Sequence, residues 1–238
     1  YSISFSWETR PLLGTYNTRG VCQGNIFIMG FSLGHILYFH MPRTAGDSIR
    51  KSIDNFPHLC RITTHHNQEW ATDQIKQHKN NSNKNSFTFV RNPYNRLYSA
   101  YNWIMNRDTS RNDELAGVDL EEKQFLSKFD NVNDFAKNVK DVDINQSFMV
   151  HFHPLSKWIW DDEVLVTNVF KFEDLFIDDT DFKDWCKKND LIYNGLIDET
   201  HKSNWTETNY FDYWDKDSIF NINKLYEKDF QIFGYELR

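Results

Sequence analysis

The chain has 238 residues, long enough for one large domain with its own hydrophobic core. Aromatic residues make up 16% of it, which excludes a chain that is disordered throughout. The formal net charge of −7 argues against general affinity for nucleic acid or for an anionic membrane, and no apolar run approaches the roughly 20 residues that span a bilayer. The three cysteines are an odd number without paired spacing, which favours free thiols in a reducing compartment.

The first 34 residues contain five of the nine glycines, and we expect them to form an N-terminal arm or irregular extension. Residues 35–238 show no long linker and no internal repeat, so we expect a single domain there. The apolar stretch 25–39 is broken by glycines and predicts a buried strand with a turn. Apolar runs predict buried strands at 35–40, 86–90 and 164–172.

Helical periodicity and capping signals alternate with these strands. The predicted helices cover residues 47–56, 67–79, 93–106, 119–129, 131–140, 179–189 and 215–230. Strands separated by helices predict a three-layer α/β fold, with a mostly parallel sheet and helices on both faces. In such a fold a ligand binds at the carboxyl ends of the strands.

The loop after the first of these strands carries groups that suit an anion. Arg43 offers a planar fork of donors, and Thr44, Ala45, Gly46, Asp47 and Ser48 can offer backbone N–H groups at a helix N-terminus. Gly46 allows a close backbone approach, and Asp47 or Ser48 is expected to cap the helix. The loop lacks the first glycine and the lysine of a nucleotide-triphosphate loop.

The loop after the second of these strands has a similar character. Arg91 ends the strand, Pro93 lies in the first turn of the next helix, and Ser99 follows two turns along. Arg91 and Ser99 can therefore reach a phosphate beside the strand end. Residues 35–111 contain 11 basic against 5 acidic residues, whereas residues 112–238 contain 14 against 28. Both loops thus lie in the basic part of the chain and suit a ligand with a phosphate at each end.

These two loops, in this order, resemble the sulfotransferase superfamily, and most closely its carbohydrate-type branch (heparan sulfate 2-O-sulfotransferase and its bacterial and viral relatives). Residues 40–48 (HMPRTAGDS) are similar to the family's 5′-phosphosulfate loop, and residues 89–101 (FVRNPYNRLYSAY) to its 3′-phosphate motif. Weaker similarity continues in FKFEDL, residues 170–175, and YEKDFQIFGY, residues 226–235. The resemblance implies a P-loop NTPase-like sulfotransferase fold and the donor 3′-phosphoadenosine 5′-phosphosulfate, with adenosine 3′,5′-bisphosphate as product.

Two residues depart from the family pattern. Arg43 stands where members commonly have a lysine, which is thought to stabilise the bridging oxygen as sulfate leaves; arginine keeps the charge but is a poorer proton donor. Asp47 stands where the pattern has threonine or serine, and a carboxylate near a phosphate is repulsive. We therefore expect Asp47 to turn away as a helix cap, with only its backbone facing the ligand.

The resemblance also implies a base for the acceptor hydroxyl, because related enzymes place a histidine ahead of the helix that corresponds to 67–79. His66 is the preferred residue, and His65 and Glu69 are its alternatives. The reaction needs no metal, and we expect none. The sequence shows no metal-ligand spacing, since His151 and His153 are followed by Pro154 rather than by further ligands.

The leading hypothesis is therefore a sulfotransferase that acts on an acceptor hydroxyl, with a carbohydrate acceptor favoured and no nucleic-acid or membrane partner. One alternative is a catalytically silent nucleotide- or glycan-binding module, suggested by Arg43 and Asp47. Another is a nucleotide-dependent kinase, against which the missing glycine and lysine weigh. The oligomeric state is open, and so is the compartment: cytoplasm for a bacterial or viral type, Golgi lumen if an N-terminal anchor was removed.

Overall fold

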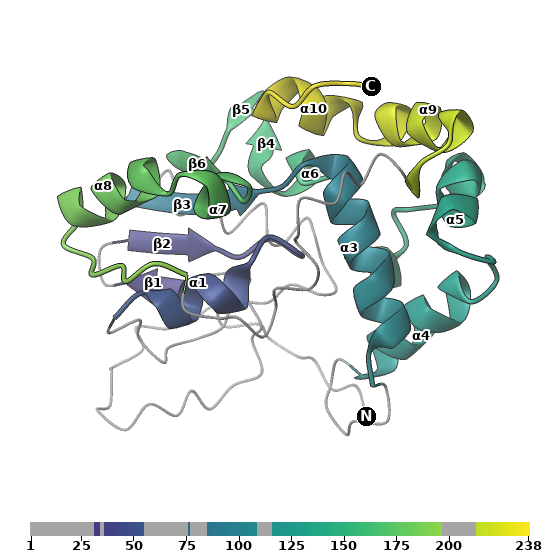
Figure 1. Ribbon diagram of the computed structural model, residues 1–238, viewed down its shortest axis with the longest axis horizontal. Coiled ribbons are helices and arrows are strands. Elements are labelled where there is room, and N and C mark those ends of the chain that lie inside the picture. Colours follow the sequence, from purple (N-terminus) through teal and green to yellow (C-terminus); the bar gives the residue numbers. More distant parts are fainter. Residues whose placement is uncertain (1–30, 34–35, 55–75, 77–84, 109–115, 197–212) are drawn as a thin grey trace, which may run out of the picture.

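A four-stranded β-sheet with helices packed around it forms the core of the fold (Figure 1). The computed structural model describes residues 31–33, 36–54, 76, 85–108, 116–196 and 213–238. The sheet has the order β1-β2-β3-β6. Its strands are β1 (Phe31–Leu33), β2 (Ile36–Phe39), β3 (Asn85–Val90) and β6 (Asn168–Lys171).

Strands β2, β3 and β6 are parallel, with Tyr38 opposite Phe87 and Phe87 opposite Asn168. The three predicted strands are thereby confirmed, and their carboxyl ends meet at one edge of the sheet. Strand β1 pairs antiparallel with β2, as expected for a strand with a turn. The third strand is shorter than predicted, because Val164 belongs to β5 (Glu163–Val164), which pairs with β4 (Trp160–Asp161).

Helices cover both faces of the sheet, which confirms the three-layer prediction. Side chains of neighbouring strand residues point to opposite faces, so Tyr38 and Phe39 enter different cores. On one face Tyr38 packs with helices α1 (Gly46–Ser52), α7 (Asp174–Ile177) and α8 (Thr180–Lys188). On the other, Phe39 packs with α6 (Ser156–Ile159) and α10 (Glu227–Phe233). Cys186 in α8 is a buried free cysteine, whereas Cys22 and Cys60 lie outside the described residues.

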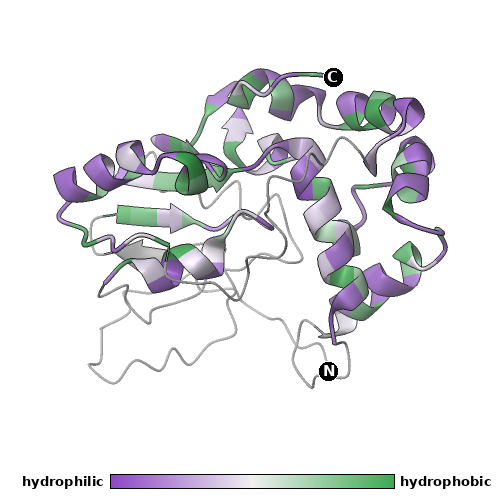
Figure 2. Cartoon of the chain, in the orientation of Figure 1, coloured by the Kyte–Doolittle hydropathy of each residue, from purple (hydrophilic) through white to green (hydrophobic). Residues whose placement is uncertain are grey.

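A helical part flanks the carboxyl-end edge of the sheet and lies to the right in Figure 1. Its long helix α3 (Pro93–Asn106) buries Leu97, Tyr101 and Ile104, as its periodicity predicted. In Figure 2 the helices of this part carry both hydrophilic and hydrophobic residues, as expected for helices with one buried face. Around α3 lie α4 (Ala116–Leu126), α5 (Val132–Asn138), the short turns η1 (Val139–Asp141) and η2 (Ser147–Met149), and α9 (Lys216–Leu225).

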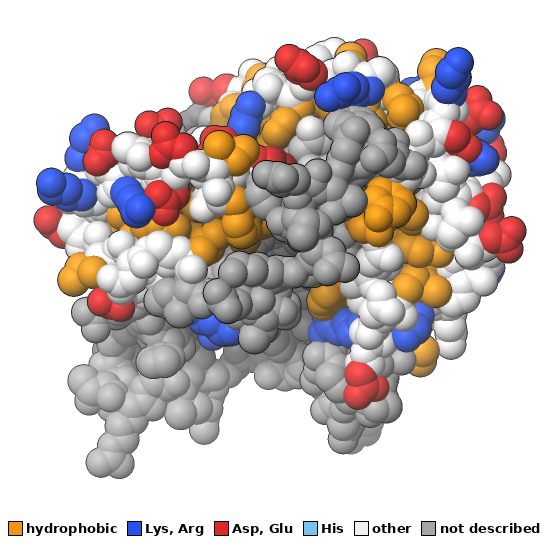
Figure 3. Space-filling model, viewed as in Figure 1, with side chains coloured by type: hydrophobic (Ala, Val, Ile, Leu, Met, Phe, Trp, Pro, Cys, Tyr) orange, Lys and Arg blue, Asp and Glu red, His pale blue; other side chains and the backbone are white. Residues whose placement is uncertain are grey.

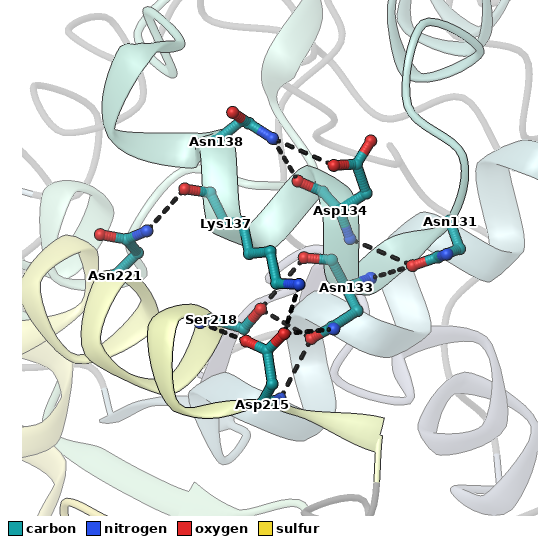
Figure 4. A network of polar contacts seen from close by, with 8 residues as sticks. All are labelled: Asn131, Asn133, Asp134, Lys137, Asn138, Asp215, Ser218 and Asn221. Carbon is teal, nitrogen blue, oxygen red and sulfur yellow. Dashed lines mark hydrogen bonds and ion pairs between the residues drawn. The ribbon is translucent and has the colours of Figure 1, made fainter.

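A polar network fastens α9 to α5 (Figure 4). Asp215 caps α9 by accepting from the Ser218 N–H, and its Oδ2 also accepts from the Asn133 amide at 2.9 Å and pairs with Lys137 at 2.5 Å. The hydrogen bond from Lys137 is the largest cause that lowers the pKa of Asp215. A second link runs from the Asn221 amide to the Lys137 carbonyl at 2.6 Å. The C-terminal helices are therefore tied to the domain by polar as well as apolar contacts.

Three predicted helix boundaries need correction. The predicted helix 131–140 is α5 followed by the tighter turn η1, and the helix predicted over 215–230 is two helices that meet at Tyr226. Helix α1 ends at Ser52, because Ile53 is extended and forms a β-bridge with Tyr193. The predicted helix 67–79 lies outside the described residues except for Lys76, which pairs with Asp161 at 2.7 Å. Among the described helices, none has the length and hydropathy of a membrane span.

Candidate functional site

The two predicted anion loops meet at the carboxyl ends of β2 and β3. The Arg91 guanidinium donates a hydrogen bond from Nη1 to the backbone carbonyl of Arg43 at 3.3 Å. The Arg43 guanidinium in turn donates to Ser99 Oγ, at 3.4 Å from Nε and 3.3 Å from Nη2. Arg43, Arg91 and Ser99 therefore lie within one contiguous site, although the sequence placed Arg43 with one loop and the other two residues with the second.

The first loop has a tightly turned backbone. Arg43 and Ala45 both adopt left-handed conformations, with φ of 64° and 66°, which residues other than glycine rarely do. The fully buried Thr44 holds the turn between them by donating from Oγ1 to the Met41 carbonyl at 2.8 Å. Backbone strain of this kind costs of order 1–3 kcal/mol per residue and clusters at functional sites. The loop therefore has one specific, hydrogen-bonded conformation, which a simple connection between a strand and a helix would not require.

Gly46 was expected to allow a close backbone approach to a ligand, and in the structure the group that lies against it is the His40 ring. A Cβ atom added at Gly46 would lie 1.9 Å from ring atoms Cδ2 and Nε2 of His40. Any other residue at this position would displace the imidazole, since real Cβ atoms do not come so near. Gly46 and His40 thus fit together and fix the start of α1 against the end of β2.

The prediction that Asp47 or Ser48 caps α1 is wrong. The N-cap is Ala45, which makes no side-chain cap hydrogen bond, and its carbonyl already accepts from the Ile49 N–H at 2.9 Å. The two left-handed residues turn the chain early, so Asp47 and Ser48 lie inside the first turn. The half-exposed Asp47 carboxylate instead pairs with Arg50 at 3.8 Å, and Ser48 is buried.

The site concentrates positive charge in a buried place. Arg91 is only 6% exposed, with its guanidinium carbon 4.2 Å from the centre of the Phe172 ring. The pKa of Arg43 is lowered to about 9, mainly by burial and also by the nearby charges of Arg91 and Arg107, against a weaker opposite effect of Asp47. Like charges held together away from water create a strong field that an anion would neutralise.

Two downstream motifs support the second loop. Glu173, in the FED segment, accepts the Asn92 N–H on Oε1 and the Tyr235 hydroxyl on Oε2, both at 2.9 Å. Asn92 is the N-cap of α3 and accepts from the Tyr94 N–H. One carboxylate therefore joins the loop that carries Arg91 to the FGY segment near the end of the chain. The sequence showed both segments as motifs but did not show that they touch.

Another motif residue, Arg96, has a structural role. It is 1% exposed and donates to the carbonyls of His151 at 3.0 Å and His153 at 2.6 Å. Its guanidinium carbon also lies 5.2 Å from the centre of the Tyr226 ring. Arg96 thus holds the segment 151–153 against α3 and does not face the Arg43 site.

A buried cluster beside the site was not foreseen from the sequence. Arg107 pairs with Asp119 at 2.7 Å, and His151 Nδ1 lies 2.7 Å from Glu122 Oε2. Burial lowers the pKa of His151 to about 3, helped by the charge of Arg43, and burial raises the pKa of Glu122 well above its usual range. The indole of Trp103 contacts this cluster and also Arg43. The i, i+4, i+8 spacing of Ser99, Trp103 and Arg107 was the available signal.

The residues considered for the acceptor base, His66, His65 and Glu69, lie outside the described residues. They remain predictions from the sequence. The described residues therefore define the side of the site that Arg43, Arg91 and Ser99 form.

The mostly parallel sheet carries an arginine-lined site at its carboxyl edge, which is where ligands bind in α/β folds of this kind. The family model described as Sulfotransferase family matches residues 28–236, and the chain belongs to that family. It is thus a sulfotransferase, and the matched span includes the sheet, both loops and the FED and FGY segments. The searches of curated proteins and of solved structures find no match.

Proposed function

We propose that this sulfotransferase takes its sulfuryl group from 3′-phosphoadenosine 5′-phosphosulfate and transfers it to an acceptor hydroxyl on a carbohydrate. The observation that carries the proposal is the convergence of Arg43, Arg91 and Ser99 at two neighbouring strand ends. A donor with phosphate at its 3′ and 5′ positions suits a site in which two basic loops adjoin. The lowered pKa of Arg43, to about 9, supports an anionic ligand, because nearby arginines account for part of the shift.

Each residue then has a distinct role at the donor. Arg91 and Ser99 bind the 3′-phosphate, and the backbone N–H groups of 44–48 with Arg43 bind the 5′-phosphosulfate. Arg43 contacts Ser99 and therefore lies between the two ends. Sulfuryl transfer is an in-line displacement in which the acceptor oxygen bonds to sulfur as the bond from sulfur to the 5′-phosphate oxygen breaks.

The chain's own groups handle charge and proton in that step. Arg43 remains protonated at neutral pH, so it stabilises the negative charge that grows on the leaving phosphate oxygen without giving up a proton. His66 takes the proton of the acceptor hydroxyl, with His65 or Glu69 as the alternative base. No metal is needed for either role.

Asp47, the residue that raised the possibility of a silent binding module, does not oppose this function. Its carboxylate is half exposed and pairs with Arg50, so its charge is directed toward solvent and partly neutralised. Described acidic and basic side chains are interspersed on the face in Figure 3, without a broad basic surface of the kind that binds nucleic acid. We therefore assign the basic residues Arg43 and Arg91 to the binding of a small anionic ligand.

A binding comparison followed by a turnover assay tests the proposal. We expect the protein to bind adenosine 3′,5′-bisphosphate more tightly than adenosine 5′-phosphate, and to prefer either over adenosine triphosphate. Labelled sulfate should then pass from the donor to a glycan in an acceptor screen. Preference for the triphosphate would support a kinase, and tight bisphosphate binding without turnover on any acceptor would support a silent module. Labelling of a non-carbohydrate hydroxyl would retain the reaction and refute the acceptor.

A further inference from the structure

The side chain of Trp103 lies at the junction between the Arg43 site and the buried cluster behind it. Its ring centre is 4.9 Å from the guanidinium carbon of Arg43 and 3.9 Å from that of Arg107. The His151 ring lies 4.8 Å away, tilted by 44°. Trp103 follows Ser99 by four residues on α3, so the two side chains share a helix face and contact the same guanidinium.

The groups behind Trp103 hold its ring in place. Arg107 is fixed by its ion pair with Asp119, which is 2% exposed, and Lys123 donates to the Arg107 carbonyl at 2.9 Å. His151 is fixed by its 2.7 Å contact with the fully buried Glu122. Neighbours whose own partners are buried leave an indole little freedom to rotate.

Asp119, Glu122 and His151 also have the composition of a metal site, since each offers a ligand atom within 4.8 Å of the others. The positive surroundings argue for a supporting role instead. Arg107 already binds Asp119, and the charges of Arg43, Arg107 and Arg96 disfavour a further positive charge on His151. A divalent cation placed among these ligands would face the same repulsion.

We propose that Trp103 is a positioning residue, which holds the guanidinium of Arg43 at the orientation that the donor requires. Arg43 is partly buried, and an arginine with a long flexible stem must otherwise be ordered when the ligand binds, which weakens binding. Stacking on an aromatic face fixes the guanidinium plane while leaving its N–H groups available for oxygen atoms. This inference rests on the proposed donor site and adds a residue that is not part of either loop.

The test compares two substitutions at Trp103 with a matched control elsewhere. Trp103→Leu removes the aromatic face, and we expect the Kd for adenosine 3′,5′-bisphosphate to rise about five- to thirtyfold, whereas Trp103→Phe keeps a face and should stay within about threefold. The control is Trp160→Leu, because the Trp160 ring lies 5.3 Å from the Lys228 ammonium, away from the site. It should leave the Kd unchanged. Calorimetry gives each Kd, and thermal melting verifies folding.

A double-mutant cycle separates positioning from general support. In an Arg43→Met background, Trp103→Leu should have little further effect on the Kd, because Trp103 acts through Arg43. Equal losses in both backgrounds would overturn the proposal. So would stabilisation of the unmodified protein against heat by Zn²⁺ or Mn²⁺ that is abolished by Glu122→Gln, since the cluster would then be a metal site.

A ligand-free measurement keeps this inference distinct from the proposed function. The Nε–H resonance of Arg43, assigned through its loss in Arg43→Met, should show a ring-current shift. This shift should be smaller in Trp103→Phe and absent in Trp103→Leu. If the wild-type protein fails to bind the bisphosphate, the proposed function fails, and this resonance still reports whether the ring orders Arg43. An unshifted, averaged resonance would overturn the positioning role.

Discussion

The guanidinium of Arg91 donates a hydrogen bond to the backbone carbonyl of Arg43, and this contact joins the two loops of the site. In the proposed donor site, the side chain assigned to the 3′-phosphate thus also orders the backbone assigned to the 5′-phosphosulfate. Because Arg43 adopts a left-handed conformation at that point, its carbonyl is directed by the turn and held by Arg91. The two halves of the site are therefore expected to respond together to substitution.

Arg91→Ala should weaken adenosine 3′,5′-bisphosphate binding by roughly 2–4 kcal/mol, because a buried charge pair with the 3′-phosphate is lost. Isothermal titration calorimetry measures the effect. Adenosine 5′-phosphate lacks the 3′-phosphate and serves as the matched ligand, whose affinity should change much less. Lys183→Ala on α8, where Lys183 pairs with Asp179, is the control for loss of a cation elsewhere. Unchanged bisphosphate affinity in Arg91→Ala would remove this assignment.

Asp47→Thr should leave donor affinity similar or improve it, because the Asp47 carboxylate pairs with Arg50 and does not cap α1. Its effect on the free energy of unfolding should be within about 0.5 kcal/mol, as for other exposed ion pairs. Calorimetry and urea denaturation test the two statements separately. A large loss of affinity would mean that the carboxylate contacts the donor or its acceptor.

Gly46→Ala should destabilise the protein by about 1–3 kcal/mol, the usual cost of overpacking, because its Cβ would collide with the His40 ring. His40→Ala makes room for that methyl group. In the double variant the two effects should therefore compensate in part, which urea denaturation of all four proteins measures. Strictly additive free energies would show that the cost of Gly46→Ala does not come from the His40 ring.

Donor affinity should depend on pH through Arg43. Its pKa is lowered to about 9 in the folded protein, so the guanidinium is charged at neutral pH and loses its proton as the pH rises through that value. Anion binding favours the charged form, and affinity should be level between about pH 7 and about pH 8 and fall above about pH 9. Arg43→Met should bind more weakly and show no such decline. A level profile for the wild-type protein would contradict the assignment.

Tyr235→Phe should destabilise the protein by about 1.5–3 kcal/mol, since the hydroxyl donates to the Glu173 carboxylate. Because Glu173 also accepts from Asn92 beside Arg91, donor affinity should fall several-fold as well. The control is Tyr213→Phe, on a side chain that is 44% exposed. Denaturation and calorimetry supply the two values. Loss of stability with unchanged affinity would show that Glu173 does not order the loop.

The sequence sufficed for the features that local patterns determine. The parallel strands, the position of α3 and the adjacency of the two loops follow from apolar runs, from Pro93 and from the topology of an α/β sheet. The cap of α1 was mispredicted because two left-handed residues, Arg43 and Ala45, start the helix earlier than side-chain preferences indicate. The turn is held by the hydrogen bond from the buried Thr44 to the Met41 carbonyl, a contact that helix-capping preferences do not take into account.

The contacts between residues that are far apart in the sequence could not be predicted either. Glu173 and Tyr235 are 62 residues apart, and Glu122 and His151 are 29 apart, so no periodicity connects them. His151 looked like half of a short His-x-His motif, yet its partner is Glu122, whereas His153 faces the Gln146 carbonyl. Such groups meet only in the folded chain: α4, which carries Glu122, packs against η2 just before His151, whereas Glu173 follows β6 and Tyr235 follows α10.

The like charges of Arg43 and Arg91 also have a consequence for the protein's life in the cell. Their mutual repulsion subtracts from the stability of the native state. If the proposed nucleotide binds there, it neutralises these charges and, as a ligand of the native state alone, restores that stability. Supply of the nucleotide should therefore set how long each molecule survives against proteases, so that scarcity of the co-substrate lowers the abundance of the catalyst along with its turnover.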